Sequence, residues 1–586
     1  MPQDAKPSSS SNQKWGSDVV AETIRALGYR HIALVPGASF RGLHDSLVNH
    51  LGNRDPGMVV CLHEGHAVAI ADGYSRATDE PMAVALHSNV GLMHATMSIF
   101  NAWCDRRPML IIGATGPVDA HKRRPWIDWV HTSKDQGALI RDYIKWDDQP
   151  ASAEAAVEAV LRADQITRTT PCGPVYVCLD AEMQEAALDR EVKVPPVSRY
   201  RSGEPPAASA ELVARVAKAL RAAKFPVILA GRVSRQKADW DRRVKLAEAL
   251  GAAVLTTLHK AAAFPTEHPN HVLAPMGDKP SPDETALLEK ADLILSLDWH
   301  DLAGAITARS GKSQTQSPTA ATVVSCSLDS YLANGWSMDH QALPAVDIPV
   351  LADPDRFVAQ LLEALPAGKP ATAPQQEFPH WTRSAPTGPA PDKVFNLEQL
   401  ALTVSAFAKD KPVTFARLPI GWPRQASRFG DPLAFLGKDG GGAVGTGPGH
   451  TVGAALALKD SGRLVIGVLG DGDYSMGVNA LWTASAQKLP VMVIVSNNRS
   501  YYNDEVHQER MAKQRGRPVE NKWIGQRLQD PELDLSGLAR AQGFEASGPV
   551  RNVAELRAAL EKGAAIVGGG GRFLIDANVE AGYAQT

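Results

Sequence analysis

The chain has 586 residues, 44% hydrophobic and 21% charged, and this length predicts about three globular domains rather than one core. A net charge of −3 excludes the strongly basic surface typical of nucleic-acid-binding proteins, and no apolar run reaches the roughly 20 residues of a membrane-spanning helix. Five scattered cysteines without a C-x-x-C pair predict reduced thiols in a cytoplasmic protein.

The chain alternates structured regions with proline-rich connectors. Its first residues lack the apolar core of a signal peptide, and the two connectors are too polar and too rich in proline to be regular. The predicted divisions are a disordered leader (1–16), a first α/β domain (17–187), a linker (188–209), a central α/β domain (210–365), a second linker (366–393) and a third domain (394–586).

Short apolar runs mark the strands of all three domains, each separated from the next by helical or glycine-rich stretches. Near-continuous apolar strands that alternate with helices predict parallel sheets covered on both faces. The sequence therefore predicts an α/β protein with three doubly wound parallel-sheet domains. The expected strands are 31–37, 58–62, 82–87, 109–115 and 174–179, then 225–231, 252–258, 292–299 and 322–328, and finally 464–470, 491–495 and 573–579.

One stretch of the third domain carries readable chemistry. A strand at 464–470 runs into Asp471, a helix is expected at approximately residues 474–487, and the next strand ends just before Asn498. Parallel strands bring both side chains to the carboxyl edge of a sheet, where α/β proteins bind ligands. Their oxygen atoms suit Mg²⁺ together with substrate phosphates, and Gly470 and Gly472 let a ligand approach the backbone closely. The alternative is a buried Asp and Asn that cap turns in an ordinary βαβ unit.

The spacing favours the ligand site. Asp471 and Asn498 lie 27 residues apart, and a GDG triplet followed by a double Asn resembles the diphosphate-binding signature of thiamine diphosphate enzymes. The resemblance implies that Mg²⁺ is held by Asp471, Asn498 and the backbone carbonyl of Ser500. It also implies that thiamine diphosphate contacts Gly470, Gly472, Asp473, Asn498 and Tyr501.

In the first domain, Glu64 lies at a strand-to-helix junction among apolar neighbours, which disfavour an ionised carboxylate. Taken alone, such a residue is more often an acid that only stabilises the first turn of a helix. The surrounding HEGHAVAIADGYSRAT and LHSNVGLMHATMSIFNAW resemble the pyrimidine-binding domain of the benzoylformate decarboxylase and acetolactate synthase branch of these enzymes. The resemblance implies that Glu64 activates the cofactor, that His87 is a substrate-side acid/base, and that Val444 bends the cofactor.

Several residues depart from the benzoylformate decarboxylase pattern. Ala38 stands where a substrate-binding Ser is expected, so Ser39 or His44 would have to replace that hydroxyl. His300 of the central domain is the candidate for a second pocket histidine, with an ordinary loop residue as the alternative. After the metal site, Asn503, Asp504 or His507 could line the pocket; a solvated helix face is the favoured interpretation of this charged segment.

The resemblance implies an enzyme that cleaves or forms a C–C bond next to a carbonyl, foremost a 2-oxo acid decarboxylase with carboligase activity. An acetolactate synthase-like carboligase, for which FAD in the central domain stays open, and a C–C hydrolase of a 1,2-diketone are alternatives. A catalytically silent binding protein has no chemical need for Glu64, and an unrelated nucleotide-binding protein would need a phosphate-binding fingerprint that is absent from the sequence. The family pattern also implies a homodimer or homotetramer with active sites at the subunit interface.

Overall fold

A computed structural model describes residues 12–277, 280–306, 319–332, 343–365 and 395–582. It contains three sheets with helices on their faces, which confirms the predicted α/β class. Contacts divide the chain into two compact units, which are described separately: 1–203, 439–550 and 558–581 form unit 1, and 204–438, 551–557 and 582–586 form unit 2. Most of the predicted leader and the whole of the linker at 366–393 lie outside the described residues.

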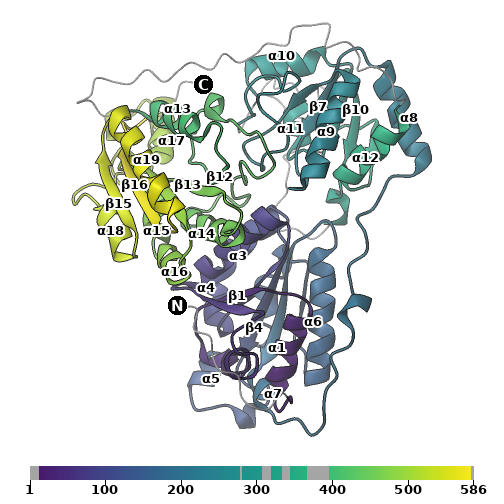
Figure 1. Ribbon diagram of the computed structural model, residues 1–586, viewed down its shortest axis with the longest axis vertical. Helices are drawn as coiled ribbons and strands as arrows, with labels where there is room; N and C mark the ends of the chain where they lie inside the picture. Colours follow the sequence, from purple (N-terminus) through teal and green to yellow (C-terminus); the bar gives the residue numbers. More distant parts are fainter. Residues whose placement is uncertain (1–11, 278–279, 307–318, 333–342, 366–394, 583–586) are drawn as a thin grey trace. The chain divides into compact units, whose positions relative to one another are not determined.

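The first sheet, in unit 1, has the strand order β2-β1-β3-β4-β6-β5, and its strand pairs are parallel. Helices α1 (Gly16–Ala26) and α6 (Ala153–Arg168) pack on one face with α3 (Glu64–Thr78) and α4 (Ser88–Cys104) on the other (Figure 1). The short helices are α2 (Arg41–Asp45), α5 (Ile127–Val130) and α7 (Ala181–Glu185). The strands are β1 (His31–Leu34), β2 (Gly57–Val60), β3 (Met82–Ala85), β4 (Met109–Thr115), β5 (Trp146–Asp148) and β6 (Pro174–Asp180).

Four strands of unit 1 follow one another in a second sheet in the order β13-β14-β16-β15. Gly470 pairs with Ser496 in the parallel register, so the residues that follow both strands leave the sheet at the same edge, as predicted. The strands are β13 (Leu464–Gly470), β14 (Val491–Asn497), β15 (Glu545–Val550) and β16 (Arg572–Asn578). The helices are α14 (Gly447–Leu458), α15 (Asp471–Gly477), α16 (Ala480–Ala486), α17 (Tyr502–Gln514), α18 (Leu535–Ala541) and α19 (Val553–Gly568).

The single helix expected at approximately residues 474–487 is instead the pair α15 and α16, and α15 begins directly at Asp471. The break follows Gly477, where a methyl group would lie 2.3 Å from the carbonyl oxygen of Gly445. Close packing against a distant backbone segment therefore coincides with the end of α15, and helical periodicity carries no signal for such a contact.

Helices α3 and α14 pack against each other through glycines. A methyl group on Gly73 would meet the carbonyl oxygen of His450 at 2.2 Å, and one on Gly453 would meet the carbonyl oxygen of Ile70 at 2.0 Å. Only a residue without a side chain permits such a close approach of two backbones. The contact joins the first domain to the glycine-rich segment of the third within unit 1.

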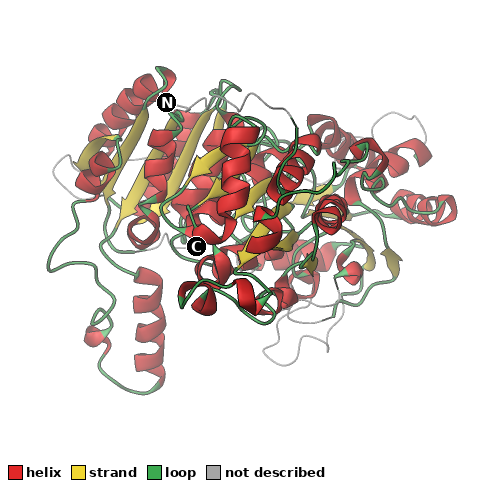
Figure 2. Cartoon of the chain, turned by 90° about the horizontal axis from the view of Figure 1, so that it is seen from below, coloured by secondary structure: helices red, strands yellow, loops and turns green. Residues whose placement is uncertain are grey.

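Unit 2 contains a sheet with the strand order β11-β10-β9-β7-β8. Helices α8, α9 and α12 share one core with this sheet, and α10 and α11 share another. Figure 2, which colours the described chain by secondary structure, shows yellow strands side by side with red helices around them. None of the described helices combines the length and apolar character needed to cross a membrane. The strands are β7 (Pro226–Ala230), β8 (Ala253–Leu255), β9 (Leu293–Leu297), β10 (Thr322–Cys326), β11 (Ile348–Val350) and β12 (Val413–Arg417). The helices are α8 (Ala210–Ala222), α9 (Lys237–Leu250), α10 (Pro282–Lys290), α11 (Leu302–Ile306), α12 (Pro354–Ala364) and α13 (Leu397–Ala408).

Candidate cofactor site

The turn that follows β14 is tied to the residue that follows β13. The backbone N–H of Ser500 donates to Oδ2 of Asp471 at 3.1 Å and to Oδ1 of Asn498 at 3.0 Å. Asp471 also accepts from the N–H of Gly472 at 2.8 Å. The structure therefore gathers the side-chain oxygens of Asp471 and Asn498 around one turn, the set expected for a hard cation.

Asp471 is 4% exposed, and burial raises the pKa of its carboxyl group to about 6, although backbone N–H groups oppose the shift. A bound cation would remove this penalty by supplying the opposite charge. A methyl group at Gly470 would meet no atom within 4 Å, so the space beside this strand end is open. At Gly472 a methyl group would lie 2.5 Å from the Tyr501 ring, so the ring can pack here only because residue 472 has no side chain. These residues fit a metal-bound diphosphate.

Residues 439–447 form a segment here called the glycine loop. Asp473 accepts hydrogen bonds from the backbone N–H groups of Gly445 at 2.7 Å and Gly447 at 3.2 Å. Asp473, expected as a cofactor contact, is thus engaged in holding the loop. Gly445 has φ +95°, a conformation that favours glycine. Val444, which lies in this loop, is 43% exposed. An apolar side chain that supports a ligand has to be accessible in this way.

Glu64 is the first residue of α3, and its side chain is 12% exposed. Its Oε2 lies 3.0 Å from Nδ1 of His94 on α4. A methyl group on Gly91 would approach Oε1 of Glu64 to 3.4 Å. Helix α4 therefore holds the Glu64 side chain through two residues one helical turn apart.

The histidines around Glu64 were not predicted. The His63 ring stacks on that of His94 with centroids 5.1 Å apart and planes 19° apart, and burial lowers the pKa of His66 to about 4. The ligand atoms of His63, Glu64 and His94 lie within 4.8 Å of one another. However, an imidazole lone pair lies in the ring plane, so two nearly parallel stacked rings do not point at one ion. The sequence could not predict these contacts, because nothing in the local pattern indicates which side chain a histidine will pack against.

His87 precedes α4 and lies against the turn that contains Ala38 and Ser39. Its Nδ1 lies 2.9 Å from Oγ of Ser39 and 3.4 Å from the Ser39 N–H, while Ser39 Oγ accepts from the N–H of Ser88 at 3.1 Å. The Ser39 hydroxyl therefore donates to Nδ1, which leaves the imidazole proton on Nε2. A second unpredicted histidine, His131, meets the His87 ring edge-on at 4.8 Å.

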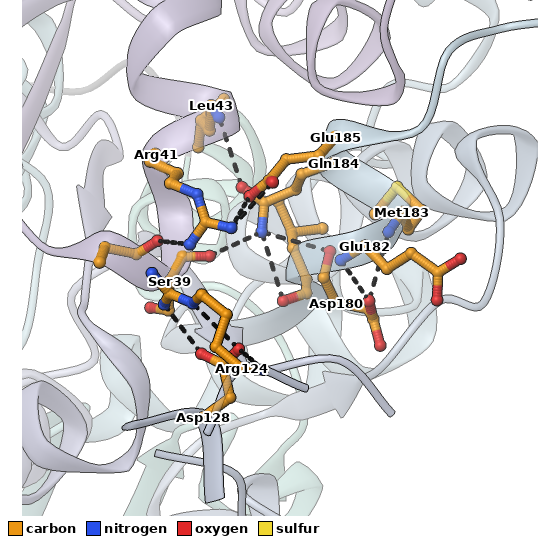
Figure 3. A network of polar contacts seen from close by, with 12 residues as sticks. Ser39, Arg41, Leu43, Arg124, Asp128, Asp180, Glu182, Met183, Gln184 and Glu185 are labelled. Atoms are coloured by element: carbon orange, nitrogen blue, oxygen red, sulfur yellow. Dashed lines mark hydrogen bonds and ion pairs between the residues drawn. The ribbon is translucent and has the colours of Figure 1, made fainter. Parts of the chain in front are cut away.

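In this arrangement the Ser39 side chain faces His87. Ser39 is 5% exposed and orients His87, whereas Ala38 at the same turn is exposed. Figure 3 shows the network behind the turn: Gln184 donates to the Ser39 carbonyl at 3.0 Å, and Arg41 donates to the Ala38 carbonyl at 3.0 Å. The pKa of His87 lies below its ordinary value because the ring is partly buried and lies beside His131.

The remaining candidates lie in a loop of unit 2 and in helix α17. His300 lies in unit 2, with its ring 6.0 Å from that of His259. Asn503 and Asp504 begin α17, the first half-buried and the second exposed. Most of α17 is exposed, in line with the solvated helix face that the charge pattern favoured. Glu505, which was not predicted, is buried there and accepts from Oγ of Ser500 at 2.6 Å.

Helix α4 connects the two halves of the site within unit 1. Its first turns hold Glu64, and further along it a methyl group on Gly441 would lie 2.2 Å from Oδ1 of Asn101 and 3.2 Å from Cε of Met97. The glycine loop thus packs against the same helix, α4, that contacts Glu64, and Asp473, two residues after Asp471, holds its other end. Helix α4 and the glycine loop therefore lie between Glu64 and the segment that begins at Asp471.

Three family models match the sequence and together span most of it. They are thiamine pyrophosphate enzyme, N-terminal TPP binding domain, over residues 14–139; the central domain over 213–361; and the C-terminal TPP binding domain over 420–577. Each model covers one of the three sheet-containing regions in the predicted order.

Among curated relatives, benzoylformate decarboxylase of Pseudomonas aeruginosa is 28% identical over 76% of this chain and 79% of its own length. Acetolactate synthase isozyme 3 large subunit of Escherichia coli is 23% identical over 83% and 82%. Benzoylformate decarboxylase from Polynucleobacter necessarius has a solved structure with a TM-score of 0.79 at 21% identity, covering 98% of this chain and 100% of that one. The 4-hydroxybenzoylformate decarboxylase of Rhodococcus jostii RHA1 gives a TM-score of 0.78 at 22% identity, covering 97% and 100%.

Proposed function

We propose that this chain, which belongs to the thiamine pyrophosphate enzyme family, cleaves or forms a C–C bond next to a carbonyl group, foremost as a 2-oxo acid decarboxylase with carboligase activity. The observation that carries the proposal is that Glu64, at the start of α3, and the glycine loop both pack against the same helix, α4. This helix links the carboxyl group proposed for the aminopyrimidine ring with the loop proposed as the apolar support of a bent cofactor.

Each residue has a definite task in this proposal. Asp471, Asn498 and the Ser500 carbonyl would hold Mg²⁺ and through it the diphosphate, while Val444 would support the bend of the cofactor. Bound thiamine diphosphate supplies a nucleophilic carbon and accepts the electrons released when a C–C bond breaks. Glu64 holds a proton at the ring nitrogen. His87, with its proton on Nε2, moves protons on the substrate side.

The test is a substrate screen on protein loaded with thiamine diphosphate and Mg²⁺. Benzoylformate and pyruvate are supplied separately, and aldehyde and acyloin products are separated by chromatography. Benzaldehyde from benzoylformate supports the decarboxylase, and acetolactate from pyruvate supports the carboligase alternative; a yellow protein with flavin absorbance would accompany the latter. Cleavage only of a 1,2-diketone would favour the hydrolase. No turnover of any of these compounds by the loaded protein would contradict the proposal.

We also propose that the protein is a homodimer or homotetramer with its active sites at the subunit interface. Close to Glu64, Leu62, Met93 and Met97 are 47%, 58% and 43% exposed within one chain. Exposed apolar side chains grouped beside a functional site are typical of an interaction surface, and a second copy of the chain is the occupant that the proposal names. Analytical ultracentrifugation tests it, and a monomer at micromolar concentration with cofactor present would contradict it.

A further inference from the structure

The carboxylate of Glu64 is held by α4 in an asymmetric way. Oε2 faces Nδ1 of His94 at 3.0 Å, whereas Oε1 lies beside Gly91 on the same helix, α4, where a methyl group would come to 3.4 Å. The two oxygens therefore have different environments: one faces a ring nitrogen that can donate, and the other lies beside a residue without a side chain.

His63 supports this arrangement from the other side. Its Nδ1 accepts the backbone N–H of Gly65 at 3.0 Å, which fixes the ring at the start of α3. The His94 ring, whose side chain is 54% exposed, stacks on it. A stacked and hydrogen-bonded ring has fewer accessible rotamers than a free one, so His94 presents Nδ1 to Glu64 in a defined orientation.

We propose that His94 is a positioning residue for Glu64. It donates its Nδ1–H to Oε2, so that this oxygen is occupied and Oε1 is the oxygen presented to the ring nitrogen of the cofactor. The inference rests on the proposed function, because it assumes that Glu64 serves thiamine diphosphate. A hydrogen bond to a carboxylate is among the stronger ones in proteins, and its loss would let Glu64 adopt rotamers that do not reach the cofactor.

The test compares His94→Asn with His94→Leu. An Asn amide places a donor close to the position of Nδ1, whereas Leu fills similar space without one. The protein is loaded with thiamine diphosphate and Mg²⁺, and the exchange of the thiazolium carbon proton for deuterium is followed by acid quench and NMR. Cofactor affinity is measured separately by tryptophan fluorescence. His121→Leu, at an exposed histidine, is the matched control.

We expect His94→Leu to slow the exchange about tenfold or more, the factor that corresponds to a lost hydrogen bond to a charged group, with cofactor affinity changed less than threefold. His94→Asn should recover most of the rate, and His121→Leu should exchange like the wild type. Wild-type exchange in His94→Leu, or equal losses in the Leu and Asn variants, would overturn the proposal.

Glu64→Gln separates this inference from the function on which it rests. If Glu64→Gln exchanges slowly while His94→Leu exchanges normally, only the role of His94 is wrong. If Glu64→Gln exchanges as fast as the wild type, Glu64 does not activate the cofactor, and the proposed function and the role of His94 are both overturned.

Discussion

Asp105 accepts a hydrogen bond at 2.6 Å from the backbone N–H of Gly440, a residue 335 positions later in the chain. The same carboxylate pairs with Arg76, which also donates to Asp72 at 2.9 Å, and Asp72 lies 2.9 Å from Nε2 of His450. All four side chains are at most 5% exposed. This buried network anchors the first residues of the glycine loop to α3 and α4, as Asp473 anchors the last.

Asp105→Asn should destabilise unit 1. The change keeps an oxygen for Gly440 but removes the charge of one of the two buried carboxylates that pair with Arg76, and losing a hydrogen bond between charged groups costs about 1.5–3 kcal/mol. Urea denaturation at pH 7 measures the change in the free energy of unfolding. The control is Asp79→Asn, which weakens the more exposed pair with Arg107 and should cost less than about 1 kcal/mol. Equal costs for the two variants would show that the Asp105 network contributes no more than a surface pair.

Glu64→Gln should leave the binding of thiamine diphosphate largely intact and lower kcat by at least about 100-fold, the usual contribution of a positioned acid or base. Glutamine keeps the size of the side chain but cannot supply the proton. Steady-state kinetics and fluorescence titration of the cofactor measure the two effects. Glu80→Gln, at an exposed position, is the control. A wild-type rate in Glu64→Gln would rule out the proposed role.

Asp471→Ala should abolish the retention of cofactor that depends on Mg²⁺. The variant removes the carboxylate that the Ser500 turn surrounds, so the metal loses one of its few protein ligands. Protein is mixed with thiamine diphosphate with or without Mg²⁺, desalted, and assayed for bound cofactor. Asp460→Ala, at an exposed turn, should behave like the wild type. Undiminished Mg²⁺-dependent retention in Asp471→Ala would contradict the proposed metal site.

Ser39→Ala should shift the acid limb of the pH–rate profile upward. Partial burial lowers the pKa of His87, so the ring stays neutral at pH values below the ordinary histidine pKa. Activity that needs the neutral ring is lost only as the pH falls through this lowered pKa. The Ser39 hydroxyl donates to Nδ1 and stabilises the neutral ring. Its removal should raise the pKa of His87 by about half a unit to one unit, the equivalent of one neutral hydrogen bond.

The profile of kcat/KM against pH measures this shift in the acid limb. Ser152→Ala, which removes a helix cap on α6, serves as a control with no contact to His87. A limb that moves downward in Ser39→Ala, or stays in place, would show that Ser39 does not set the protonation of His87.

Much of the fold could be predicted from the sequence where the local signal was strong. The strands β4 and β13 are continuous apolar runs and appear with the predicted bounds. The edge strands β5 (Trp146–Asp148) and β15 (Glu545–Val550) were missed, because neither is a continuous apolar run. Each forms by pairing with a neighbouring strand, β5 with β6 and β15 with β16.

The sequence alone predicted that Glu64, Asp471 and Asn498 follow strands at the sheet edges where α/β proteins bind ligands, because strand–turn–helix patterns are local. Only the tertiary structure decided which side chains orient them. The contacts of Glu64 with His94, of Ser39 with His87 and of Asp105 with Gly440 join residues 30, 48 and 335 positions apart. Such contacts depend on how distant helices and loops pack in the folded chain, and no local periodicity or motif encodes that packing.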